Sequence, residues 1–323
     1  MSAPERIPPG RMSGTAPAAE ATRELLRQGT LTVRGQITAA SNTVLFGTVE
    51  HEGSSLPCVY KPVAGERPLW DFPDGNLARR EVAAYEVSRA TGWDLIPATV
   101  LRDGPYGPGM CQAWVGEPPE TADDDDGDAP SEGAAEEAAE TASEDEPGEE
   151  PASLLALVDG EEPGEGWKAV GFADVGGGRT ALLVHADDPR LRRLAVLDAV
   201  LNNGDRKGGH LLPRPDGALY AIDHGVTFHV DDKLRTLLWG WAGEELTGEA
   251  VEALRRLSAA LCADPGGPAE AADAGEAPLA ARLAELLTQA EVQAVGKRVE
   301  ALLSSGRHPL PSGEWPAIPW PPV

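Results

Sequence analysis

The sequence is poor in basic residues and in cysteine. It carries 53 Asp and Glu against 27 Lys and Arg, which gives a formal net charge of -26. Nucleic acids and anionic membrane surfaces are bound by basic surfaces, so neither is expected as the main partner. The three cysteines, Cys58, Cys111 and Cys262, are odd in number and lack metal-ligand spacing. We therefore expect no disulfide framework and no zinc ribbon, and cysteine usage favours a reducing, cytoplasmic location.

Long apolar segments are also missing. No stretch of about twenty apolar residues, the length that spans a bilayer, occurs in the sequence. The first residues, MSAPERIPPGRMSG, lack the apolar core of a secretory signal. We therefore expect no integral membrane association.

Most of the negative charge lies in one segment. Residues 117–150 hold 16 Asp or Glu and no Lys or Arg, which leaves a net charge of -10 on the rest of the chain. The segment has no aromatic residue, so it cannot bury enough apolar area to offset the entropy of ordering. This composition predicts a disordered acidic insert, 117–151. The insert would separate an N-lobe, 19–116, from a C-lobe, 152–308, with terminal tails at 1–18 and 309–323.

The proposed N-lobe has the pattern of a small sheet. The stretches TLTVRGQI, NTVLFGTVEHEG and LPCVYKPV are rich in β-branched residues and separated by turn signals, which predicts strands. NLARREVAAYEVSRATGW has apolar residues at helical spacing, with Gly92 as its stop. IPATVLRDG and GPGMCQAWVG then complete the sheet, after a short helix predicted in AEATRELLRQG.

Beyond the insert the pattern becomes mainly helical. Four stretches show three-to-four-residue apolar spacing: PRLRRLAVLDAVLNN, TGEAVEALRRLSAALCA, APLAARLAELLTQ and AEVQAVGKRVEALLSS. The stretch GGGRT is expected to be a hairpin turn rather than a phosphate loop, because no Lys-Ser or Lys-Thr follows it. The fold class is therefore predicted as α+β: a bilobal, protein-kinase-like fold with a β-rich N-lobe around one central helix and a mainly helical C-lobe.

Phosphoryl transfer between such lobes requires a strand lysine, a helix glutamate, an acid near the nucleophile and metal ligands. Lys61 ends a predicted strand on the same face as Val59, where an inward lysine calls for an anion. Glu81 and Glu86 both lie on the following helix and either could pair with it; we favour Glu81, which is nearer the start of the helix.

Two short loops of the C-lobe carry the remaining polar groups. LNNGDRKGGHLL supplies Asp205, Arg206 and His210, and YAIDHGVTFH supplies Asp223 at the end of an apolar strand. Carboxylate and phosphate oxygens are what magnesium prefers. The two loops therefore predict a site for a cation and a phosphate.

These residues resemble a known family. Asp205-Arg206, His210 and the later Ile222-Asp223-x-Gly225-x-x-Phe228 are similar to the D-R-x-x-x-N and I-D-x-G-x-x-F loops of the phosphatidylinositol 3-/4-kinase-related superfamily. YKPVAGERPLW, REVAAYEVSRATG and NNGDRKGGHLL resemble stretches of its type II phosphatidylinositol 4-kinase branch. The resemblance covers about residues 31–228 without the insert, and it suggests a bacterial group of the superfamily.

The resemblance implies roles for individual residues. Lys61 would bind the ATP phosphates and Glu81 would hold Lys61. Asp205, with Arg206 beside it, would orient or deprotonate the acceptor hydroxyl, and Asp223 would bind magnesium. His210 stands where the superfamily has a metal-binding Asn. The positions implied for nucleotide binding are Ser41 and Asn42 over the phosphates, and Gln112, Ala113, Trp114 and Val115 beside adenine.

The functional expectation is an ATP- and magnesium-dependent kinase whose acceptor is a hydroxyl of a protein or small molecule. A phosphoinositide acceptor is less favoured, because no basic patch flanks the motifs. Two alternatives remain open. The chain could be a nucleotide-binding scaffold without transfer activity, or a metal-dependent hydrolase that uses His210, His224 and His229 with the two aspartates.

Overall fold

The computed structural model describes residues 16–37, 42–72, 75–119, 154–174, 177–263 and 277–319. The expected N-terminal tail and acidic insert lie almost entirely outside these ranges. Within them, no helix is long and apolar enough to cross a membrane.

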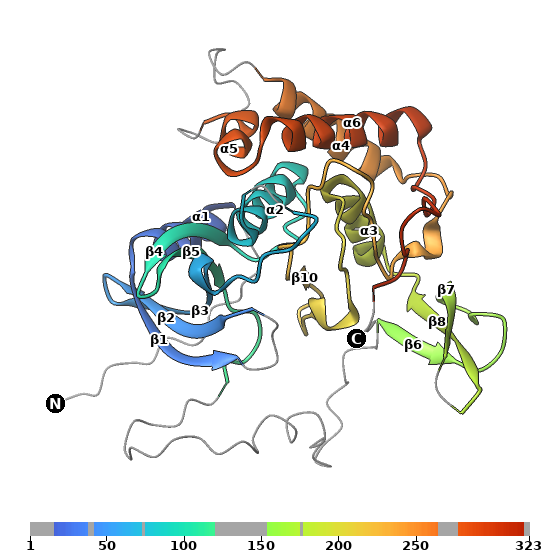
Figure 1. Ribbon diagram of the computed structural model, residues 1–323, viewed down its shortest axis with the longest axis horizontal. Coiled ribbons are helices and arrows are strands. Elements are labelled where there is room, and N and C mark those ends of the chain that lie inside the picture. The colour runs from blue at the N-terminus through green and yellow to red at the C-terminus, as the bar shows by residue number, and fades with distance from the viewer. Residues whose placement is uncertain are drawn as a thin grey trace.

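A five-stranded antiparallel sheet forms the N-terminal lobe (Figure 1). Its spatial order is β1-β2-β3-β5-β4, so the strand that ends in Lys61 is central. The β3–β5 register places Lys61 opposite Met110. The strands are β1 (Thr30–Ile37), β2 (Val44–His51), β3 (Ser54–Pro62), β4 (Thr99–Gly104) and β5 (Gly107–Ala113).

Two helices belong to this lobe. Helix α1 (Ala16–Gln28) contacts β4 and β2, and helix α2 (Leu77–Thr91) connects β3 to β4. The Asn76 side chain caps the start of α2, and Gly92 ends it at a φ of 73°, a left-handed conformation that glycine adopts without strain. Most of α2 is buried because it also contacts helices of the other lobe. Contacts with both lobes therefore determine the position of α2.

The C-terminal lobe begins with strands where the sequence had suggested mainly helix. A three-stranded sheet of order β6-β8-β7 is built from β6 (Leu155–Val158), β7 (Trp167–Asp174) and β8 (Thr180–Ala186). The apolar run in β8 is buried, and such a run has no periodicity that separates strand from helix. Gly177 and Gly178 form a turn between β7 and β8, in agreement with the hairpin expected there.

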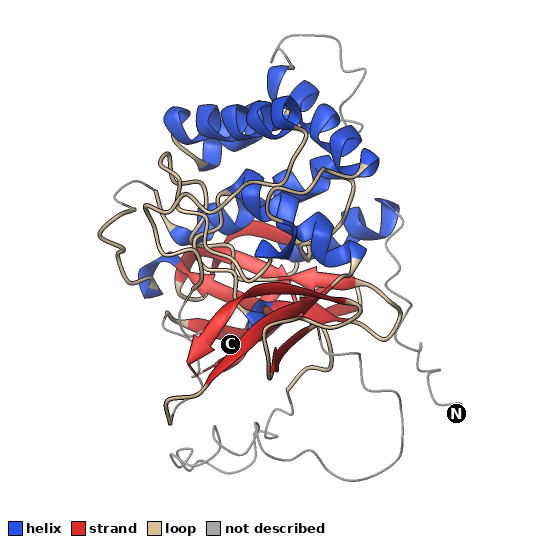
Figure 2. Cartoon of the chain, turned by 90° about the vertical axis from the view of Figure 1, so that its right-hand side faces the viewer, coloured by secondary structure: helices blue, strands red, loops and turns tan. Residues whose placement is uncertain are grey.

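The expected helices follow. They are α3 (Pro189–Leu201), α4 (Gly248–Cys262), α5 (Leu279–Leu286) and α6 (Gln289–Ser305). One continuous apolar core joins α2 to α3, α4, α5 and α6. The helices gather on one side of the molecule and the strands on the other (Figure 2). The α+β class and the bilobal layout are thus confirmed.

Between α3 and α4 the chain forms a small hairpin and long loops. The hairpin pairs β9 (Leu211–Pro213) with β10 (Leu219–Ala221). One polar loop precedes β9 and the other follows β10, so the hairpin brings them together. The C-terminal stretch is extended, and the carbonyl of Ala317 accepts hydrogen bonds from the Thr236 amide and the Trp239 indole.

Candidate active site

Lys61 and Glu81 meet inside the N-terminal lobe. Nζ of Lys61, at the end of β3, lies 2.6 Å from Oε1 of Glu81 on α2. Glu81 is almost fully buried, so the ammonium supplies the partner that a buried carboxylate needs. Glu86, the other candidate, instead lies within ion-pair distance of Arg23, Arg89 and Arg282.

Asp223 reaches the same ammonium from the C-terminal lobe. Its Oδ1 atom lies 2.9 Å from Nζ of Lys61. The backbone of Asp223 has a φ of 60°, a left-handed conformation that aspartate tolerates better than most residues. The next amide, that of His224, donates to Oε2 of Glu81 at 2.9 Å. Glu81 therefore holds both the lysine and the loop that carries Asp223.

The three charges shift one another's proton affinity. Burial lowers the pKa of Lys61, but the carboxylates of Glu81 and Asp223 outweigh it and raise that pKa above its ordinary value. The Lys61 ammonium holds the pKa of Asp223 well below its ordinary value, against the effect of burial. At neutral pH the Lys61 ammonium therefore lies beside the ionised, half-exposed carboxylate of Asp223.

Asp205 follows the end of α3. Asn202 caps the end of the helix in a left-handed conformation, and Oδ1 of Asn203 then accepts the amide of Asp205 at 3.0 Å. The Asp205 carboxylate is partly exposed and lies 3.1 Å from Nζ of Lys207. Lys207, which the sequence analysis did not single out, is the nearest cation to this carboxylate.

Arg206 turns inward, away from solvent. It is fully buried, and its Nε and Nη2 atoms each lie 2.9 Å from an oxygen of Asp198. Nη1 donates to the Ile222 carbonyl at 2.9 Å, and Nη2 lies 2.7 Å from Nε2 of His224. The guanidinium thus links α3, the Asp205 loop and the Asp223 loop. Asp198 was missed, although an acid inside the apolar helical stretch LAVLDAVL is a visible signal.

The histidines separate into different environments. Nε2 of His210 lies 3.4 Å from Oδ2 of Asp223, and burial lowers the pKa of His210 while Asp223 opposes that shift. His224 is buried against Arg206, and His229 packs edge-on against Phe72. In the part of the chain that the structure describes, no three His, Cys, Asp or Glu side chains are arranged as metal ligands. The convergence that the hydrolase alternative requires is therefore not observed there.

The positions assigned to nucleotide binding differ in what they contact. Ser41 lies outside the described residues, and Oδ1 of Asn42 accepts the amide of Arg67 at 2.9 Å. Gln112 is buried and donates to Thr99.

At the end of β5, the amides of Ala113 and Trp114 already donate to the carbonyls of Ala98 and Pro57. Among the described residues, none accepts a backbone hydrogen bond from Val115. The amide of Val115 is therefore without a described backbone acceptor, unlike the amides of Ala113 and Trp114.

Glu66 is another residue that the sequence motifs do not indicate. Its two carboxylate oxygens accept the amides of Leu77 and Ala78, each at 2.8 Å. These are N–H groups of the first turn of α2, which lack partners within the helix. The loop after Lys61 thereby fixes the start of the helix that carries Glu81.

Comparisons with known proteins place these observations in context. No family model matches the chain. Protein Rv2133c of Mycobacterium tuberculosis is 43% identical over 297 residues, which cover 92% of this chain and 94% of that protein.

Two solved structures have a similar backbone trace at low sequence identity. The hydra Fam20 structure with sugar matches with a TM-score of 0.49 and 12% identity, covering 90% of this chain and 89% of that one. The Golgi casein kinase with Mn/ADP bound matches with a TM-score of 0.48 and 11% identity, covering 96% and 81%. Similarity at this level does not define an activity.

Proposed function

We propose that this chain, which belongs to the family of Protein Rv2133c of Mycobacterium tuberculosis, is an ATP-dependent phosphotransferase with a hydroxyl acceptor. The observation that carries the proposal is the meeting of Lys61, Glu81 and Asp223 between the two lobes. The distances are 2.6 Å from Nζ of Lys61 to Glu81 and 2.9 Å to Asp223. A strand lysine held by a helix glutamate, beside a carboxylate from the second lobe, is the arrangement that protein kinases use for phosphoryl transfer.

The residues present fit a divalent cation in part. The Asp223 carboxylate is half-exposed, ionised and close to the lysine, and carboxylate oxygen is a ligand that magnesium prefers. His210 offers an imidazole, a ligand better suited to softer metals than magnesium. We therefore assign Asp223 to the cation, whose contribution when bound is to neutralise phosphate charge. His210 is a neighbour of that site.

In this proposal the residues of the chain have separate roles. Lys61 would pair with the nucleotide phosphates, and Asp205 would accept the proton of the attacking hydroxyl. The new bond joins the acceptor oxygen to the γ-phosphorus, the bond to the β,γ-bridging oxygen breaks, and ADP leaves. Arg206 is too deeply buried to reach a substrate, so its role would be to position the loops through Asp198 and Ile222.

The acceptor is proposed as a protein or small-molecule hydroxyl. The resemblance to the phosphatidylinositol 3-/4-kinase-related superfamily supports hydroxyl transfer in general. The net charge of the chain disfavours a highly anionic phosphoinositide headgroup. Nucleotide-dependent transfer to a neutral or weakly charged acceptor is the form of the proposal that this charge supports.

The test is incubation with γ-labelled ATP and magnesium, alone and with cell lysate, followed by mass spectrometry of labelled products. Asp205→Asn should lower transfer or ATP hydrolysis at least a hundredfold, on the order expected for a lost base, and keep ATP affinity within a few-fold. Asp231→Asn, on an exposed loop, is the matched control and should behave as the parent. Equal turnover by Asp205→Asn and the parent would remove Asp205 from the mechanism.

A scaffold that binds nucleotide without transfer is the second candidate. It is favoured by His210 in the position of the expected metal-binding Asn, 3.4 Å from Asp223. This candidate requires that ATP raise the melting temperature while no phosphate is released or transferred with any acceptor tested. The same labelled-ATP experiment separates the two.

A further inference from the structure

A groove of about 410 Å³ lies away from the candidate active site. It is bounded by the C-terminal half of α6, the end of α3, the segment 230–234 and residues 309–310. Lys61, Glu81, Asp205 and Asp223 are not among its lining residues. A proposal about this groove therefore does not depend on phosphotransfer.

Its walls are largely apolar, and part of them is open to solvent. Ala301 and Leu302 of α6 and Leu234 contribute to the walls. Val230 is 50% exposed and Leu310 is 67% exposed, so two large aliphatic side chains face water at the groove. Exposed apolar surface gathered in a concave site is typical of ligand binding.

The groove is also cationic, in a chain of strongly negative charge. Lys297, Arg298 and Arg307 line it, against the single carboxylate of Asp232. Lys297 has no ion-pair partner among the residues that the structure describes. Arg298 donates to the carbonyls of Val200 and His229 instead of to a carboxylate.

Arg307 is only loosely satisfied. It donates to the Gly243 carbonyl at 2.7 Å and meets Glu245 at 3.4 Å, where both side chains are exposed. Exposed pairs of this kind contribute little and exchange partners readily.

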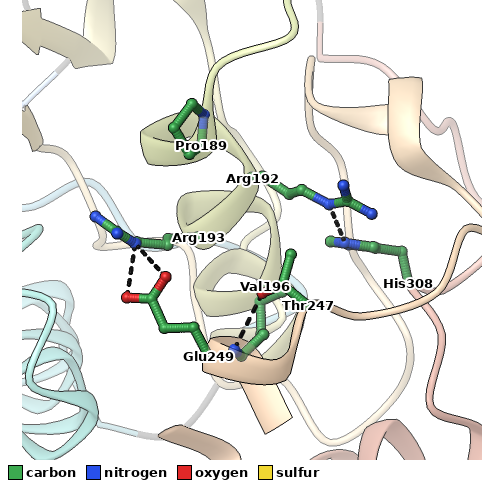
Figure 3. A pocket seen from close by; sticks show the side chains of 8 residues that line it. Pro189, Arg192, Arg193, Val196, Thr247, Glu249 and His308 are labelled. Atoms are coloured by element: carbon green, nitrogen blue, oxygen red, sulfur yellow. Dashed lines mark hydrogen bonds and ion pairs between the residues drawn. The ribbon is translucent and has the colours of Figure 1, made fainter. Parts of the chain in front are cut away.

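A smaller cavity at the start of α3 provides a contrast (Figure 3). It too is lined by charged groups, but its cations have carboxylate partners. Arg193 lies 3.0 Å from Glu249. Nη2 of Arg192 lies 3.3 Å from Oε2 of Glu244. The cations of the small cavity are therefore paired, whereas the groove along α6 has cations that a ligand can bind.

We propose that the groove along α6 binds a small amphipathic carboxylate, with its apolar body against Leu302 and Leu310 and its charged group near Lys297. Ligand pockets of proteins are roughly 300–1,000 Å³, so the groove has the size that takes a small ligand. A medium-chain fatty acid has this size. One negative charge also balances half of the excess of cations over Asp232.

The test uses sodium octanoate as the probe, with 1-octanol and octyl phosphate as comparisons, by calorimetric titration of the full chain. Octanoate should bind at one site per chain and raise the melting temperature, since it binds the folded state. 1-Octanol should bind at least about tenfold more weakly, because it lacks the charge that the cations recognise. Lys297→Gln should weaken octanoate binding about tenfold, while Arg255→Gln, at an exposed position of α4, leaves it unchanged.

A second variant tests the location without removing a charge. Ala301→Phe fills the groove from an exposed helical position and should abolish octanoate binding, and Ala290→Phe at the other end of α6 is its control. Equal binding by Ala301→Phe and the parent would overturn the proposal. So would octyl phosphate binding more tightly than octanoate, which assigns the groove to phosphate headgroups. A parent dimer dispersed by Leu310→Asp, without octanoate binding, would identify the occupant as a second copy of the chain.

Discussion

Nζ of Lys61 lies 2.9 Å from Oδ1 of Asp223, although the two residues are 162 positions apart in the chain. One group ends a central strand of the N-terminal lobe, and the other follows a short strand of the C-terminal lobe. Their ion pair joins the lobes at the point where we propose that nucleotide phosphates and a cation enter. Both groups must then exchange this contact for contacts with the ligands.

The first prediction concerns Asp223. An ATP analogue with magnesium should raise the melting temperature of the parent, because both bind the folded state. Asp223→Ala should lose the magnesium-dependent part of that rise and keep a nucleotide-dependent part through Lys61. The measurement is thermal unfolding with nucleotide alone, with nucleotide and magnesium, and with nucleotide and EDTA. An unchanged magnesium effect in Asp223→Ala would reject the assigned metal role.

His210 supplies the second prediction. His210→Asn places an amide oxygen beside Asp223, and such an oxygen suits magnesium better than an imidazole does. We expect the ratio of magnesium- to manganese-supported ATP turnover to rise in this variant. His229→Asn, whose imidazole packs on Phe72, serves as the control. The prediction fails if the ratio of magnesium- to manganese-supported ATP turnover is the same in His210→Asn as in the parent.

The third prediction concerns the buried pair of Asp198 and Arg206. Both side chains are fully buried and share two contacts of 2.9 Å. Asp198→Asn leaves a buried guanidinium without its counter-charge, which should lower the free energy of unfolding by about 3–5 kcal/mol. Urea denaturation measures this change.

Asp231→Asn is the matched substitution at an exposed position, and it should shift the urea midpoint of unfolding little. A similarly small shift in Asp198→Asn would mean that water reaches Arg206. The position of Arg206 would then not depend on Asp198.

The fourth prediction is a dependence of stability on pH. Burial, together with the Arg192 guanidinium, lowers the pKa of His308 to about 4. The unfolded chain has the ordinary value near 6.5, so between pH 6.5 and 4 it binds a proton that the folded chain does not. The free energy of unfolding should fall as pH decreases through this window, by about 3 kcal/mol from this residue.

Urea denaturation of the parent and of His308→Asn at pH 7 and pH 4.5 checks this. His308→Asn loses the contact with Arg192 and should be less stable than the parent at pH 7. The difference in free energy of unfolding between the two should narrow at pH 4.5. Parallel pH profiles would show that His308 titrates normally.

Much of the fold could be predicted from local pattern. The five strands and helix α2 were expected within a few residues of their observed bounds, and so were α3, α4, α5 and α6, because their apolar spacing is regular. Only the hairpin turn at GGGRT was expected of the sheet of β6, β7 and β8. Its buried strand has a continuous apolar run, and tertiary packing decides whether such a run pairs as a strand.

The candidate site divides in the same way. The sequence indicated Lys61, Glu81 and Asp223 as one group, since a strand-end lysine, a helix acid and a loop acid each carry a local signal. The structure brings these three side chains together, while their roles in catalysis stay a prediction. It turns Arg206 inward to Asp198, a pairing without a local signal because seven intervening residues must first turn from helix to loop.

The sequence by itself determined most of the strands and helices, and the short loops that concentrate acid, because periodicity and turn residues act over a few positions. Only the tertiary structure decided which buried charges meet. Glu81 pairs with Lys61 while Glu86, five residues later, faces arginines of three helices. The physical reason is that a buried charge is stable only beside its counter-charge, and the packing of distant segments determines which counter-charge is within reach.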